Sequence, residues 1–435
     1  MNIEQALKAF PAKSPFRSIL PDLLDENEAV WEAAHERLRD LDRVAVGDDR
    51  LARTWNYSEA EALGILRAAI GLPFAPARAE WKDAVHDLIS LLLRCPYKSL
   101  VGPAREAYPT VSDRSKCAIL ALLGACGSID AAKALKSCIR DHGWPNHVYD
   151  RVFWEMAKLL SHASILFPEL IERAGENIGP VANVFVAAIA QGHLDLANSH
   201  CLRPLAQLVS QRLSECLEVV SQLQRDKGIA WRFTEQYWPA RHQTGAWLDI
   251  AGYLKDLAPV ALLEEALRLG DPRLAAFAVS SVLRCGGSIG DGVLERIAAC
   301  HETRALLFQL LQNHGKLELF PQTFRTWDAF AAANMVNWLM YPTELGREPD
   351  YLEKMAVFTS TKTDGELVLY VWRFRNGDDS WFAGVSGPYL FEGTPCPLHG
   401  DMTFSCFEKW DDASAEKHAE ETLKTLNEWK NARRG

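Results

Sequence analysis

Four side chains near the carboxyl end could bind a metal ion. Cys396, His399, Asp401 and Cys406 lie within eleven residues of one another. Thiolate sulfur and imidazole nitrogen are ligands that zinc prefers, and a structural zinc site needs four ligands in a tetrahedron. The segment has no second ligand pair at regular spacing, and a nucleophilic Cys–His pair would need an orienting partner that the sequence does not show. We interpret it as a Pro-rich loop packed against a sheet, and predict no metal and no cofactor.

The densest group of aromatic side chains lies in residues 231–247, which read WRFTEQYWPARHQTGAW. Aromatic and arginine side chains dominate binding hot spots. Two interpretations stay open. Either an irregular connection packs its own rings between two helical units, or an exposed aromatic ridge lies in a groove. The second interpretation predicts a partner-binding site formed by Trp231, Phe233, Tyr237, Trp238 and Arg241.

Two pairs of adjacent carboxylates, at 378–379 and 411–412, lie beside aromatic residues at expected turns. Ordinary turn chemistry and a helix-start charge account for both pairs, and a metal site or a mimic of a polyanion is the alternative. A second, speculative partner-binding group follows from the first pair and its neighbours. Its residues are Asp378, Asp379, Trp381 and Tyr389.

Linear motifs for catalysis are missing from the sequence. It contains no H-E-x-x-H, no Gly-rich phosphate loop and no G-x-G-x-x-G. We therefore predict no catalytic residues. The enzyme alternative, a hydrolase or lyase, would need a concave cluster of His, Asp, Glu and Arg with perturbed pKa values.

A segment that occurs twice indicates which elements carry these residues. Residues 117–129 read CAILALLGACGSI and residues 277–289 read FAVSSVLRCGGSI. The offset of 160 residues is four times 40. A period near 40 built from paired helices is typical of a stacked helical array, whose units bury their apolar faces against each other.

Short amphipathic segments separated by loops predict the remaining helices. Ser58 and Glu61 form a capping box at the start of one of them. The apolar spacing indicates antiparallel helix pairs joined by short connections. The principal expected helices cover 27–42, 80–94, 112–125, 147–159, 164–174, 180–190, 195–211, 243–254, 259–269, 273–284 and 291–299.

After about residue 345 the pattern changes to short strands. Segments 355–362, 366–375, 381–387 and 402–410 are rich in Val, Phe, Tyr and Trp, and Asp-Gly and Asn-Gly turns separate the first three. Both faces of 366–375 are partly apolar, so we expect this strand to be central. A final helix is expected from Ser414 to about Ala432. We predict two domains, at 1–345 and 350–435, the second a small antiparallel α+β domain.

The turn and helix at 270–279, Gly-Asp-Pro-Arg-Leu-Ala-Ala-Phe-Ala-Val, resemble the second half of a HEAT repeat. This resemblance is clearest over 110–143 and 244–315, and it implies a mainly α protein with a HEAT-like α-solenoid used as a scaffold or binding surface. Residues 381–389 are similar to a strand of bacterial HEAT-repeat immunity proteins that accompany polymorphic or secreted toxins. The resemblance implies that the chain neutralises a toxin; a general scaffold or adaptor is the alternative.

Composition sets limits on the partner. The chain has 435 residues, with 57 acidic and 47 basic side chains and a net charge of −10. A nucleic-acid binder needs a basic surface, so we predict a protein partner, such as a basic toxin or effector domain, and no nucleic acid.

Ten cysteines without a C-x-x-C pair indicate reduced thiols. Without a signal peptide or a run of ~18 apolar residues, we expect a cytoplasmic protein with no membrane contact. The sequence does not indicate the oligomeric state.

Overall fold

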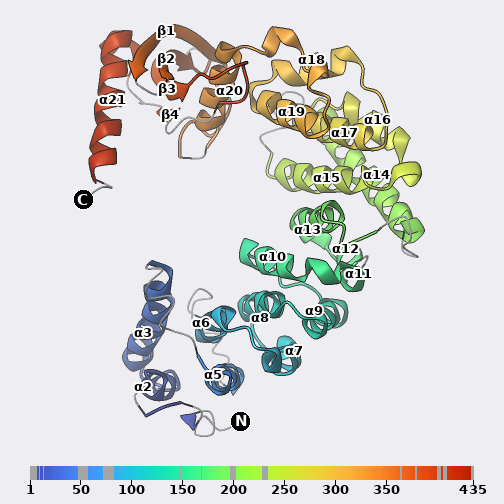
Figure 1. Cartoon of the computed structure of the whole chain (residues 1–435), viewed down its shortest axis with the longest axis vertical. Coiled ribbons are helices and arrows are strands. Elements are labelled where there is room, and N and C mark those ends of the chain that lie inside the picture. Colours follow the sequence, from blue (N-terminus) through green and yellow to red (C-terminus); the bar gives the residue numbers. More distant parts are fainter. Residues whose placement is uncertain are drawn as a thin grey trace. The chain divides into compact units, whose positions relative to one another are not determined.

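The computed structural model is mainly helical, with a small antiparallel sheet near the carboxyl end (Figure 1). It describes the chain except residues 1–6, 9, 13, 48–56, 72–82, 147, 168, 196–201, 228–233, 342, 363–364, 378–379, 399–402, 405–408 and 433–435. Two compact units divide the chain. Unit 1 contains residues 1–212 and 238–250, and unit 2 contains residues 213–237 and 251–435.

Unit 1 consists of short helices. Their bounds are α2 Phe16–Asp22, α3 Glu28–Gly47, α5 Glu59–Gly71, α6 Ala84–Leu91, α7 Val101–Ala107, α8 Asp113–Cys126, α9 Ile129–His142, α10 Asp150–Met156, α11 Ala163–Leu166, α12 Glu169–Glu172 and α13 Ile178–Ala190. Helix α14 Leu202–Lys227 begins in this unit, and most of α15 Tyr237–Ala251 belongs to it. Short 3₁₀ turns cover Leu92–Arg94, Lys98–Leu100, Tyr108–Thr110, Ala157–His162 and Gly175–Asn177.

Side-chain caps begin several of these helices. The predicted capping box is confirmed, because the Ser58 amide donates to Glu61 at 2.9 Å and the Glu61 amide donates to the Ser58 hydroxyl at 3.3 Å. Ser112 and Ser128 cap α8 and α9 through their hydroxyls alone, which accept from the amides of Ser115 and Ala131. Between α8 and α9, Gly127 has φ +60°, a left-handed conformation that ends α8 at little cost only with glycine.

Helix α14 is longer than the sequence predicts. The expected helix ended at residue 211, whereas α14 continues to Lys227. The reason is an apolar stripe that continues beyond residue 211 and is buried along its length. Its residues are Leu205, Val209, Leu213, Leu217, Val220 and Leu223.

Unit 2 joins a helical part to the sheet. Its helices are α16 Val260–Arg268, α17 Pro272–Arg284, α18 Asp291–Ala299, α19 His301–Asn313, α20 Trp327–Leu339 and α21 Ala415–Ala432, with 3₁₀ turns at Lys255–Leu257, Leu317–Leu319, Gln322–Phe324 and Trp410–Asp412. The strands are β1 Tyr351–Lys362, β2 Gly365–Arg375, β3 Phe382–Leu390 and β4 Thr403–Phe404, antiparallel and in the order β1-β2-β3-β4.

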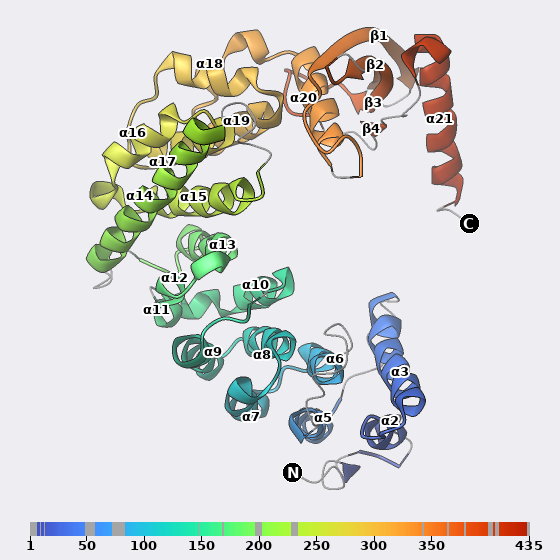
Figure 2. The ribbon, with the colours of Figure 1, turned by 180° about the vertical axis from the view of Figure 1, so that it is seen from behind.

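Strand β2 is central, as predicted, and both of its faces are covered. Helix α20 lies on one side of the sheet and α21 on the other (Figures 1 and 2). On the α21 side, Ala419 packs against Leu369, Val371 and Val385. The expected strand at 402–410 is a strand only at Thr403–Phe404, with an isolated bridge from Lys409 to Phe382; residues 405–408 lie outside the described part.

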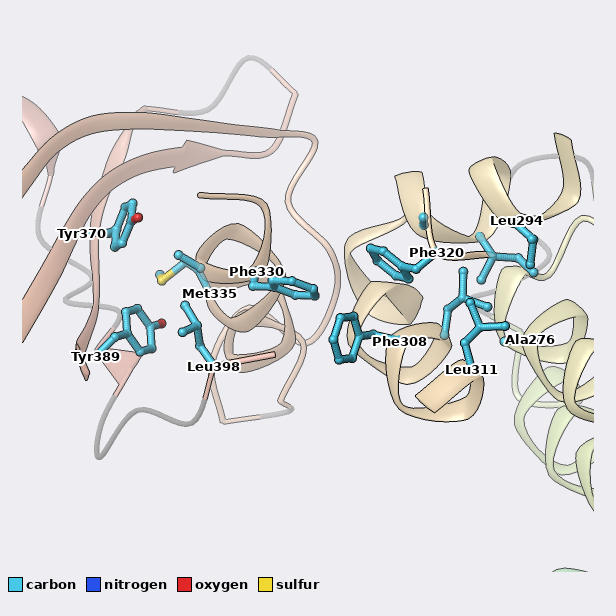
Figure 3. Close-up of a cluster of buried hydrophobic side chains, with 14 of the residues drawn as sticks. Ala276, Leu294, Phe308, Leu311, Phe320, Phe330, Met335, Tyr370, Tyr389 and Leu398 are labelled. Atoms are coloured by element: carbon cyan, nitrogen blue, oxygen red, sulfur yellow. The ribbon is translucent and has the colours of Figure 1, made fainter. Parts of the chain in front are cut away.

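One apolar cluster extends from α17–α20 to the sheet. Phe308 lies 5.3 Å from Phe320 and 5.4 Å from Phe330 between ring centroids, in edge-on contacts. Figure 3 shows these three rings between the helices. It also shows Met335, Tyr370, Tyr389 and Leu398, which lie beside the sheet. The cluster therefore contains residues from both sides of the boundary predicted at residue 345.

Candidate partner-binding surface

Trp238 is the exposed tryptophan of the aromatic segment. It lies in the first turn of α15, and 47% of its surface is accessible. The guanidinium of Arg241, one turn later, lies 5.3 Å from the centre of its ring. Arg241 itself is 94% buried. A cation over an aromatic face attracts the ring, so Arg241 restrains Trp238 in an exposed position.

A cavity of about 430 Å³ lies beside this tryptophan, within unit 1. Residues from the first turn of α13 and from the first two turns of α15 line it. They are Ile178, Gly179, Pro180, Trp238, Pro239, His242 and Gln243. A side chain at Gly179 would enter open space, since no atom lies within 4 Å of its ideal Cβ position. The cavity is large enough for one or two side chains of a partner.

Tyr237, next to Trp238 in the chain, has the opposite environment. Only 1% of its surface is accessible, and its hydroxyl donates to the buried Asp271 carboxylate. Tyr237 therefore packs inside unit 2, as the first interpretation of this segment expects, while Trp238 is exposed, as the second expects. Trp231 and Phe233 lie outside the described residues.

Trp381 belongs to a group of stacked arginine and aromatic side chains on the sheet. The guanidinium carbons of Arg373 and Arg375 lie 4.4 and 4.7 Å from its ring centre, and Arg375 also lies 4.7 Å from the ring of Tyr351. Tyr351 is 49% exposed. The sequence prediction missed both arginines and Tyr351. The one feature that could have revealed these residues is the pairing of β1 with β2, whose register places Tyr351 opposite Arg375.

The other predicted members of this group are not at the surface that the structure describes. Tyr389 is fully buried, and its hydroxyl donates to the side-chain oxygen of Asn334 at 2.9 Å. It therefore has no surface that a partner could contact. Asp378 and Asp379 lie outside the described residues.

Cysteine and metal chemistry is limited in the described part of the chain. There, no group of three or more His, Cys, Asp or Glu side chains is placed to hold a metal ion. Cys396 is exposed, while His399, Asp401 and Cys406 are outside the described residues. Burial raises the pKa of Cys117 to about 11 and that of Cys138 to about 12, so both are unreactive thiols at neutral pH.

No known family model, curated protein or solved structure matches this chain. Among the described helices, none combines the length and the apolar character needed to cross a lipid bilayer.

Proposed function

We propose that this chain is a non-enzymatic protein-binding protein whose contact with its partner centres on Trp238. One observation carries the proposal: a tryptophan with 47% of its surface exposed stands beside a cavity of about 430 Å³ and is restrained by Arg241. Binding hot spots are rich in Trp and Arg and lie beside pockets that exclude water. A restrained ring loses little conformational entropy when a partner covers it.

We also propose that the helices are stacked as a HEAT-like solenoid. Packing between alternate helices supports this architecture, because α6 contacts α8 and α8 contacts α10, while α5 contacts α7 and α7 contacts α9. Repeated helix pairs that stack side by side produce two such layers. Parallel neighbours are expected within one layer. Ala118 of α8 and Val152 of α10 line one cavity, and further along both helices Gly124 approaches the backbone of Glu155 and Met156, so α8 and α10 advance in the same direction.

The partner class that we propose is a basic toxin or effector domain, which would make the chain an immunity protein. The net charge of −10 supports a basic partner, because opposite charge accelerates association and disfavours wrong partners. A general scaffold or adaptor remains the alternative. Co-expression with a toxin encoded beside the gene separates the two, since only an immunity protein should relieve the growth arrest.

The test of the Trp238 surface is a substitution with a matched control. Trp238→Ala should reduce recovery of the partner from the native host about tenfold or more, because loss of a hot spot costs about 2 kcal/mol or more. Trp154→Ala on α10 is the control, since Trp154 is 72% exposed and lines neither described cavity. Equal recovery with Trp238→Ala and with wild type would contradict the proposal, as would a large drop in the melting temperature of Trp238→Ala.

A further inference from the structure

A second cavity in unit 1, of about 230 Å³, is lined by residues of α6, α8 and α10 and of the segments next to them. It shares no lining residue with the surface around Trp238. We propose that it binds an organic carboxylate with a compact apolar body. The lining residues are His86, Ser90, Leu93, Arg114, Cys117, Ala118, Ala121, Tyr149, Arg151 and Val152.

Small side chains on α8 create this cavity. Helices α8 and α10 lie close together at Gly124, where an added Cβ would lie 2.6 Å from the Glu155 carbonyl carbon. Toward the start of α8, the residues that face the cavity are Ala121, Ala118 and Cys117, each at most 3% exposed. These short side chains do not fill the space up to Val152 of α10. The cavity therefore has an apolar floor.

Cationic side chains line the same cavity. Arg114 and Arg151 both do so, and neither forms an ion pair with a carboxylate in the described residues. The Nε of Arg114 is buried and has no hydrogen-bond acceptor there, while the guanidinium carbon lies 6.0 Å from the ring centre of Tyr149. A buried guanidinium donor without an acceptor is costly, and a carboxylate is the group that matches its geometry.

The nearby carboxylate of Asp87 is already engaged by two histidines. Its oxygens lie 2.9 Å from Nε2 of His35 and 2.9 Å from Nδ1 of His86. His35 is 97% buried as a side chain and stacks on Trp31 with 4.9 Å between ring centroids. Burial alone would raise the pKa of Asp87, but hydrogen bonds and charge from His35 and His86 hold it well below its usual value. Asp87 therefore orients His86 at the cavity wall and does not neutralise the arginines.

The shape of the cavity restricts the ligand. An engineered cavity of about 150 Å³ holds benzene, so one of about 230 Å³ has room for a ring or branched alkyl group together with a carboxylate. Inorganic phosphate has no apolar part to cover Leu93, Ala118 and Val152, and we expect it to bind poorly. A free aromatic acid and the carboxyl-terminal residue of a peptide share the required chemistry.

Binding rather than catalysis is the chemistry that these groups support. The Cys117 thiol has a pKa of about 11 because it is buried, so it is no thiolate nucleophile at neutral pH. Asp87 is ionised and paired with two histidines. The cavity thus has a mainly apolar lining to which Arg114 and Arg151 belong, and no activated nucleophile.

Calorimetric titration of the full chain with defined probes tests the proposal. Phenylacetate represents a free acid, N-acetylleucine a peptide end, 2-phenylacetamide the uncharged isostere and inorganic phosphate the anion without an apolar body. We expect saturable binding of one or both acids, and the tighter of the two identifies the natural source. Arg114→Gln should weaken that binding about tenfold or more, and Ala121→Leu should abolish it by filling the floor. Arg67→Gln, which removes an exposed arginine from α5, should leave it unchanged.

Several results would overturn the proposal. They are no binding of either acid, equal affinity for 2-phenylacetamide or for phosphate, and wild-type affinity in both Arg114→Gln and Ala121→Leu. The melting temperature of each variant shows whether it is folded. If Ala121→Leu does not fold, Arg114→Gln still tests the proposal. Because Trp238 is not involved, the variant Trp238→Ala should bind the acid normally even where it fails to bind the protein partner.

Discussion

Helices α8 and α17 carry the two copies of the repeated segment and share an apolar frame, in which Ala118, Leu123 and Gly127 match Ala278, Leu283 and Gly287. At other positions of the two helices the residues differ in size and charge. Within the repeated segments Cys117 corresponds to Phe277 and Gly124 to Arg284, and just before them Arg114 corresponds to Leu274. Helix α8 therefore has small residues and a cation beside a cavity, while α17 has a buried leucine and a larger ring at the matching positions.

The turns that follow the two copies also differ. In the first copy Gly127 is left-handed and Ser128 caps α9 directly. In the second copy the left-handed residue is Gly286, with φ +76°, and α18 begins only at Asp291. The comparison teaches that the shared frame specifies a helix with a buried face, whereas the variable positions decide how closely the next helix approaches.

The largest expected effect comes from the close approach at Gly124. Gly124→Ala should destabilise the fold by about 3 kcal/mol, because its Cβ would meet the backbone of α10 within 3 Å and force the helices apart. Gly102→Ala on α7 is the control. No atom lies within 4 Å of its Cβ position, so alanine should leave stability unchanged or raise it by up to about 1 kcal/mol. Urea unfolding measures both, and a loss of the same size in the two variants would contradict the packing argument.

A smaller effect should distinguish the caps of the two copies. Asp271, fully buried, accepts from the amides of Arg273 and Leu274 and from the Tyr237 hydroxyl. Asp271→Ala should therefore cost about 2 kcal/mol, since it leaves buried donors without an acceptor. Ser112→Ala removes one cap on α8 and should cost about 1 kcal/mol. Thermal unfolding of both variants is the measurement. If Ser112→Ala lost as much stability as Asp271→Ala or more, the buried network would contribute little.

The smallest effect concerns the polar surroundings of the first copy. Asp87 is half-buried and adjoins His86 in the wall of the cavity beside α8, and 160 residues later the chain has Trp247, which is buried. The folded-state pKa of Asp87 is below its ordinary value, since His35 and His86 outweigh the opposing effect of burial. Its ionised form therefore stabilises the fold at neutral pH, and this contribution is lost as the pH falls from about 4 through the folded pKa.

Stability measured against pH checks this assignment. The free energy of unfolding of wild type should exceed that of Asp87→Asn by about 1–2 kcal/mol at pH 7, and this difference should shrink below about pH 4. Trp247→Phe, 160 residues later in the chain, is the comparison, and its effect should not vary with pH over the same range. A difference between wild type and Asp87→Asn that stayed constant from pH 7 to pH 3 would rule out the histidine pairing as the cause.

Local patterns predicted much of the secondary structure. The capping box at Ser58, the helix expected at 112–125 and the central strand at 366–375 depend on neighbouring residues, and the structure contains all three. The candidate site was predicted less completely. Within one aromatic segment, Trp238 is exposed and Tyr237 is buried, and no pattern in the sequence separates them, because their burial depends on α13 and on Asp271.

What the sequence by itself determined is the helical character, the repeated apolar frame, the antiparallel sheet and the acidic charge, since each depends on spacing or composition along the chain. Tertiary structure alone decided which side chains meet. His35, Asp87, Arg114 and Arg151 are far apart in the sequence, and Arg373 and Arg375 reach Trp381 only through the register of β2 with its neighbours. Helix packing and strand register create such contacts at long sequence separation, and no local spacing specifies them.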